Sequence, residues 1–237
     1  MIRKKIMRTA FRRWAQQCFI ATLFLTSVAW SQERAEERPL FELDEATWAM
    51  FYDLPSRRFR TIRDAFIRKD FVSARRDLQV SLSFLSIESD RAVESLRPPM
   101  LENMAEIRRI EESLDDPSVA VGALDSAFAR AHWLLAQHYL VQSMRSRDAE
   151  QHKAAGRYLW ATAHHLERAV LWSDSRVDAQ TVRALDSVRE MGSELQSSDR
   201  PKQVYRDKPI AVATDALTKI GAHLERKIWI TIKNEIS

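Results

Sequence analysis

The sequence contains one cysteine, Cys18, and only four glycines in 237 residues. A single cysteine forms no internal disulfide and provides no CxxC zinc motif, no set of thiolates for an iron–sulfur cluster and no CxxCH haem attachment. Four scattered glycines exclude a Gly-rich phosphate loop, and no GxSxG nucleophile elbow is present. These absences exclude many of the common catalytic and cofactor classes, and the sequence predicts neither an enzyme nor a bound cofactor.

The first 31 residues differ in kind from the rest of the chain. Residues 1–14 carry six basic side chains and no acid, and the apolar run "CFIATLFLTSVAW" follows at 18–30. This run is shorter than the ~20 residues that a spanning helix needs, and small residues stand at Ala29 and Ser31. The pattern is typical of a secretory signal peptide. It predicts cleavage after Ser31 and a periplasmic or cell-envelope protein, with an uncleaved membrane anchor as the alternative.

Removal of this segment changes the charge of the protein. The whole chain has 37 basic and 33 acidic residues, a net charge of +4, and a pI near 9.3. Without the six basic residues of the segment, 31 basic residues face 33 acidic ones, so the net charge becomes −2. The basic pI therefore belongs to the targeting segment and does not indicate nucleic-acid binding.

The spacing of apolar residues after Ser31 predicts an all-α protein. Apolar residues recur every three or four positions, strict alternation is rare, and the few glycines leave little material for hairpin turns. We expect antiparallel helical hairpins that form a bundle or a short solenoid-like array. A flexible segment at 32–43 precedes a single helical domain at 44–237, which has a loop near 197–209. The expected helices are 45–54, 57–69 capped by Ser56, 71–97 ended by Pro98-Pro99, 100–114, 118–147, 149–173, 177–195 and 210–232.

A short pattern occurs twice. The residues that begin at Ala74 and at Ala155 both read Ala-x-Arg-x-Leu, and each follows a helix and a charged break that contains aspartate, Asp70 or Asp148. Small residues at such positions let two helices approach closely, and the pattern resembles the hairpins of tetratricopeptide repeats. Sequence similarity therefore predicts two related helical hairpins.

A second resemblance covers Ala65–Leu85, "AFIRKDFVSARRDLQVSLSFL", together with the N-terminal segment. This stretch resembles the helical hairpin of the YfdX-like family of small exported proteins. The resemblance implies a periplasmic helical protein with a link to stress. It implies no catalytic residue, because that family offers no motif to transfer.

Histidine is the remaining candidate for metal or haem chemistry. None of the six histidines belongs to a Glu-x-x-His or HExxH motif or to an i, i+4 pair. His164 and His165 are adjacent, so they point about 100° apart on a helix and cannot grip one ion from one face. However, "HLER" occurs at 165–168 and again at 223–226. The ligand hypothesis is therefore a bundle site with His165 and His223, joined by His132 or His138, or by Met144 or Met191.

The alternative is that these histidines carry no chemistry. Leu159, Ala163, Leu166 and Val170 form an apolar stripe at helical spacing, and His164 and His165 flank it. A flanking histidine usually packs its ring against neighbours and keeps its polar end in water or hydrogen-bonded. We predict no dedicated metal site.

A dense basic segment is the candidate for partner binding. Its arginines can contact a protein or an anionic envelope component, while the alternative is a solvated helix face. The candidate residues are Arg57, Arg58, Arg60, Arg63 and Arg68.

Taken together, these features predict an exported, non-catalytic scaffold, adaptor or binding module of the bacterial cell envelope. Such a protein would contact the membrane only through an uncleaved N-terminal segment. The alternative is a metal- or haem-binding helical bundle.

Overall fold

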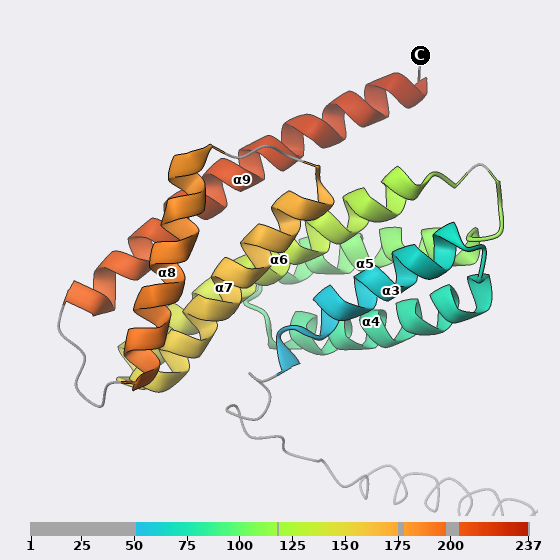
Figure 1. Ribbon diagram of the computed structural model, residues 1–237. Coiled ribbons are helices and arrows are strands. Elements are labelled where there is room, and N and C mark those ends of the chain that lie inside the picture. Colours follow the sequence, from blue (N-terminus) through green and yellow to red (C-terminus); the bar gives the residue numbers. More distant parts are fainter. Residues whose placement is uncertain (1–50, 118, 175–177, 198–203, 237) are drawn as a thin grey trace, which may run out of the picture. The chain divides into compact units, whose positions relative to one another are not determined.

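The computed structural model describes residues 51–117, 119–174, 178–197 and 204–236, which lie in one compact unit, Glu45–Ser237 (Figure 1). Helices make up 86% of these residues and no strand occurs among them, so the predicted all-α class is confirmed. The predicted signal segment, the expected flexible stretch at 32–43 and most of the expected helix at 45–54 lie outside the described residues. The helices are α3 (Leu54–Ile67), α4 (Phe71–Arg91), α5 (Arg97–Glu112), α6 (Val121–Asp148), α7 (His152–Trp172), α8 (Ala179–Ser197) and α9 (Val204–Ile236).

The hairpin of α6 and α7 forms the centre of this unit. Helices α3 and α5 contact α6 on one side, and α4 packs against both of them (Figure 1). On the other side, α8 and α9 pack against α7, and α9 also contacts α6. Within the described residues, no helix is long and apolar enough to cross a membrane.

The predicted apolar stripe of α7 packs against α6 and the C-terminal helices. Leu159, Ala163 and Leu166 are fully buried, which confirms their packing role. Leu166 joins a cluster with residues of α6, α8 and α9, and Val170 packs against that cluster while partly buried. Leu159 and Ala163 join a second cluster with Val188 of α8. The stripe therefore ties the central hairpin to the C-terminal helices.

Helix α3 runs parallel to α7 and antiparallel to α6. Tyr52, just before α3, meets Trp160 edge to face, and Ser56 hydrogen-bonds His164, so the two contacts share an offset of 108 residues. Against α6, Phe59 stacks on Phe128 with centroids 4.0 Å apart. This register fixes which residues of α3 and α7 face each other further along the two helices.

The two hairpins suggested by the repeated pattern share one turn geometry. Between α3 and α4, Lys69 adopts a positive φ of 61°, and the Asp70 amide donates to the carbonyl of Ala65 at 2.8 Å. Between α6 and α7, Glu150 has a φ of 59°, and the Gln151 amide donates to the carbonyl of Ser146, also at 2.8 Å. Both are Schellman motifs, which satisfy the last carbonyls of the preceding helix. The repeat at an offset of 81 residues is therefore a repeat of backbone structure.

Three prolines that were predicted to follow the ends of helices lie instead in the first turns of the next helices. Pro98 and Pro99 lie in the first turn of α5, whereas α4 ends at Arg91, so the predicted helix over 71–97 is wrong at its C-terminal end. Proline is accommodated in a first turn because the amides there have no partner within the helix. The same applies to Pro55, which lies in the first turn of α3.

Two further boundaries differ from the predictions. Ser56 lies inside α3 and does not cap it, because the helix begins at Leu54 and the Ser56 hydroxyl is bonded to His164. Helix α9 begins at Val204, inside the expected loop at 197–209, and includes Pro209. Burial of Ile210 and Ala213 against α7 and α8 favours a helix there despite the proline.

Candidate functional site

Four of the six histidines lie in the interior: three gather where α3, α6 and α7 meet, and the fourth, His138, faces Glu88 of α4. His132 and His138 come from α6, and His164 and His165 come from α7. His132, His138 and His165 are completely buried, and His164 is 6% exposed. Burial of so many ionisable rings in one layer is costly unless each is neutral or paired, so their partners define the chemistry of this region.

His132 and His165 bind each other. Their Nδ1 atoms are 2.8 Å apart, so one ring donates its single N–H and the other accepts. The His165 ring also stacks on Tyr139, with centroids 5.3 Å apart. Burial, reinforced by nearby positive charge, lowers the pKa of both rings well below 6.5. The pair is therefore neutral near pH 7 and joins α6 to α7.

His164 brings a serine and an aspartate together. Its Nε2 atom lies 2.8 Å from Ser56 Oγ and 3.1 Å from Asp53 Oδ1. Burial lowers the pKa of His164 to about 4, although Asp53 acts in the opposite direction. A catalytic Ser-His-Asp arrangement uses one ring nitrogen for the serine and the other for the aspartate. Here both oxygens approach the same nitrogen, which cannot accept from Ser56 and donate to Asp53 at once, so the geometry favours a structural link.

A buried carboxylate completes the polar interior. Glu88 of α4 is fully buried, accepts a hydrogen bond from the Tyr139 hydroxyl at 3.0 Å, and lies 2.8 Å from Nε2 of His138. Arg91 stands 3.6 Å from the same carboxylate. Glu88 was not predicted from the sequence. Its position three residues after Leu85, on the apolar face of α4, was the available clue.

The predicted cofactor ligands are not brought together by any described contact. His165 is bound to His132, whereas His223 lies half-buried on α9. Among the described residues, no group of three or more His, Cys, Asp or Glu side chains is arranged to hold a metal ion. Of the partners considered for His165, His132 is therefore the one that the structure places beside it.

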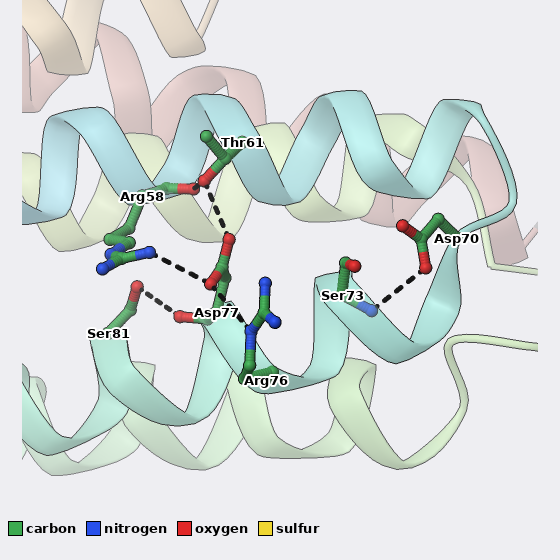
Figure 2. Close-up of polar contacts among 7 residues, drawn as sticks. All are labelled: Arg58, Thr61, Asp70, Ser73, Arg76, Asp77 and Ser81. Carbon is green, nitrogen blue, oxygen red and sulfur yellow. Dashed lines mark hydrogen bonds and ion pairs between the residues drawn. The ribbon is translucent and has the colours of Figure 1, made fainter.

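The predicted basic segment is divided among different contacts. Arg58 lies 3.1 Å from the buried carboxylate of Asp77, which also accepts a hydrogen bond from Thr61 (Figure 2). Figure 2 shows Asp77 reaching from α4 toward α3, with Arg76 beside it. These contacts join the first hairpin and use Arg58 internally.

The other four arginines differ in availability. Arg57 pairs with Asp53 at 3.4 Å, and Arg63 pairs with Asp125 of α6 at 3.0 Å. Arg60 and Arg68 are exposed and form no ion pair within the described part of the chain. The five arginines therefore do not form one free surface. Arg60 and Arg63 line a cavity, and of these two only Arg60 has no ion-pair partner among the described residues.

A cavity of about 560 Å³ opens between α3, α6 and the end of α7. Its volume lies within the range of ~300–1,000 Å³ that is typical of small-molecule sites. Ser56 forms its inner wall and connects it to the buried His164. The lining residues are Ser56, Arg60, Arg63, Asp64, Asp125, Arg168, Leu171, Trp172 and Asp174.

Arg168 is the most distinctive residue of the cavity wall. The side chain is partly buried, and its Nε atom is inaccessible to water and has no hydrogen-bond partner among the described residues. A guanidinium in this state is a strong donor for a carboxylate, phosphate or sulfate group. Arg168 was not predicted as a site residue, because it follows Glu167 in what the sequence indicates is a solvated helix face.

None of the protein-family models, curated proteins or solved structures compared with the chain matches it. The resemblances to YfdX-like proteins and to tetratricopeptide hairpins stay predictions.

Proposed function

We propose that this chain is an exported, non-catalytic binding module of the bacterial cell envelope, which holds an anionic group of its partner or ligand in the cavity between α3, α6 and α7. The observation that carries the proposal is the buried, unsatisfied Nε of Arg168 at the cavity wall, together with the exposed Arg60 on the opposite helix. Buried donors without partners are rare in folded proteins, and an anion would satisfy this one. The interior histidines support the surrounding helices and take no part in binding.

Sulfate is a suitable probe because it stays fully ionised over the accessible pH range. In calorimetric titrations at pH 7.0, with ionic strength held constant by sodium chloride, we expect wild-type protein to bind sulfate in preference to chloride. Arg168→Gln should weaken sulfate binding about tenfold, because a buried charge-assisted hydrogen bond is lost. Arg60→Gln should weaken it about threefold, since Arg60 is exposed.

Arg183→Gln provides the matched control. Arg183 is an exposed arginine of α8 that does not line the cavity, and its replacement removes the same charge. Equal losses in the Arg183 and Arg168 variants, or no preference of the wild type for sulfate, would contradict an anion site in the cavity. Arg58 and Arg63 are poor choices for this test, because their loss leaves Asp77 and Asp125 without an ion-pair partner on α3.

The export part of the proposal has its own test. When the full chain is expressed in a bacterium with an outer membrane, we expect the periplasmic extract to contain the cleaved protein. Its intact mass should match a chain that begins at Gln32. Leu25→Arg, which interrupts the apolar run at 18–30, should leave the full-length chain in the cytoplasm. A wild-type chain that keeps its first 31 residues and stays in the cytoplasm would refute export.

A further inference from the structure

Basic and acidic side chains line the cavity between α3 and α7 at different positions along the two helix axes, which we call the basic level and the acidic level. Because α3 and α7 run parallel with an offset of 108 residues, Arg60 lies level with Arg168. One turn further along, Asp64 lies level with the end of α7, where Asp174 also lines the cavity. Four residues of a helix advance about 6 Å, so a basic level and an acidic level are separated by roughly that distance.

The charges at both levels are available. Six charged residues line the cavity. Two of them, Arg63 and Asp125, form an ion pair with each other. The other four form no ion pair within the described residues: Arg60, Arg168, Asp64 and Asp174. A ligand that carried only negative charge would meet repulsion at the acidic level. The cavity lining is therefore electrically neutral as a whole but dipolar along its length.

An apolar surface lies beside the two levels. Leu171 is 65% exposed at the cavity, and Trp172 forms the adjoining wall. Leu171 lies three residues after Arg168, so both side chains project from the same face of α7. A ligand that spans the two charged levels can therefore place an apolar group against Leu171.

From this arrangement we infer that the cavity binds a zwitterion whose carboxylate and ammonium groups are about one helical turn apart, as in a dipeptide with an apolar side chain. The inference rests on the proposed anion site and adds the second charge to it. The carboxylate meets Arg60 and Arg168, and the ammonium meets Asp64 and Asp174. An extended dipeptide spans at most ~7 Å, which suits the separation of the two levels.

Three matched probes separate the contributions of the two charges. Alanyl-leucine carries both charges, N-acetyl-alanyl-leucine carries only the carboxylate, and alanyl-leucinamide carries only the ammonium group. In calorimetric titrations at pH 7.0, we expect alanyl-leucine to bind about tenfold more tightly than either capped analogue.

Asp174→Asn should lower the affinity for alanyl-leucine to that of the N-acetyl analogue. The same variant should bind sulfate at least as tightly as the wild type does. Asparagine tolerates the left-handed backbone of residue 174 (φ 48°), so this variant should fold normally.

The outcomes distinguish this inference from the proposed function. If the N-acetyl analogue or sulfate binds while alanyl-leucine binds no more tightly than the N-acetyl analogue, the zwitterion inference is overturned and the anion site stands. If neither sulfate nor any of the three probes binds, the proposed function fails as well. Asp186→Asn, an exposed carboxylate on α8 away from the cavity, should leave the preference for alanyl-leucine unchanged. If Asp186→Asn abolished the preference for alanyl-leucine over its N-acetyl analogue as Asp174→Asn does, the preference would depend on overall charge. That result would contradict the dipolar site.

Discussion

Replacement of Gly156 by alanine should lower the free energy of unfolding by about 3 kcal/mol, at the upper end of what overpacking usually costs. A Cβ atom at this position would stand 2.5 Å from the Gly192 carbonyl oxygen and 2.9 Å from Leu195 Cβ. The obstacle is largely backbone, so no side-chain rotation can relieve it, and α7 and α8 must move apart. Thermal and urea unfolding would measure the loss, which corresponds to a decrease in Tm of roughly 6–12 °C for a protein of this size.

Other glycines give a graded comparison. At Gly192 the nearest atom to a new Cβ is the Gly156 carbonyl oxygen at 2.9 Å, so Gly192→Ala should cost less than Gly156→Ala. At Gly122 nothing lies within 4 Å, and alanine there should leave stability unchanged or raise it by up to about 1 kcal/mol. Equal stability of the Gly156 and Gly122 variants would show that α7 and α8 do not cross in close contact.

The protein should lose stability as the pH falls from about 6.5 toward 4. His132, His164 and His165 all have a lowered pKa in the folded protein, chiefly because burial penalises their charged forms. Below about pH 6.5 the unfolded chain therefore binds more protons than the folded protein, which lowers the free energy of unfolding. Each histidine contributes on the order of 1 kcal/mol per pH unit, or about 3 kcal/mol for the three at pH 5.5. The contribution of His164 levels off near its folded pKa of about 4.

This pH window is separate from that of the exposed carboxylates. Hydrogen bonds from Ser73 and Thr181 lower the pKa of Asp70 and Asp178, so their stabilisation is lost only at still lower pH. Urea unfolding at intervals between pH 7.5 and 4.5 would measure the slope, and His165→Gln should reduce it by about a third. Thr162→Val alters the same buried helix without removing a titratable group and should keep the wild-type slope. A wild-type slope near zero between pH 6.5 and 5 would contradict neutral, buried histidines.

Helix content and the two equivalent hairpins could be predicted from local pattern. Helical spacing of apolar residues and the few glycines indicated an all-α chain, and the repeated Ala-x-Arg-x-Leu indicated two equivalent hairpins. Some predicted helix boundaries were wrong, because proline is common both just after the end of a helix and in the first turn of a helix. Pro98 and Pro99 suit the residues after one helix and the first turn of the next equally well, and only the position where α4 stops packing decides between them.

The candidate site was much less predictable. Arg60 was identified as part of a basic segment, but Arg168 was not, because the two are brought together only by the parallel register of α3 and α7. His165 was identified through its echo at His223, yet its bonded partner is His132, 33 residues away on the neighbouring helix. Sequence similarity between two histidine motifs carries no information about which helices become neighbours.

The sequence by itself determined that this chain is helical, that two of its hairpins turn near Asp70 and Asp148, and that it carries no internal disulfide, Gly-rich phosphate loop or GxSxG motif. These properties depend on residue types and on spacings within one helix or turn. Only the tertiary structure decided which charges are paired, which histidines are neutral, and where an unpaired arginine meets a cavity. Ion pairing and pKa depend on distances and burial between residues such as Ser56 and His164, 108 positions apart, and the packing of whole helices sets those distances.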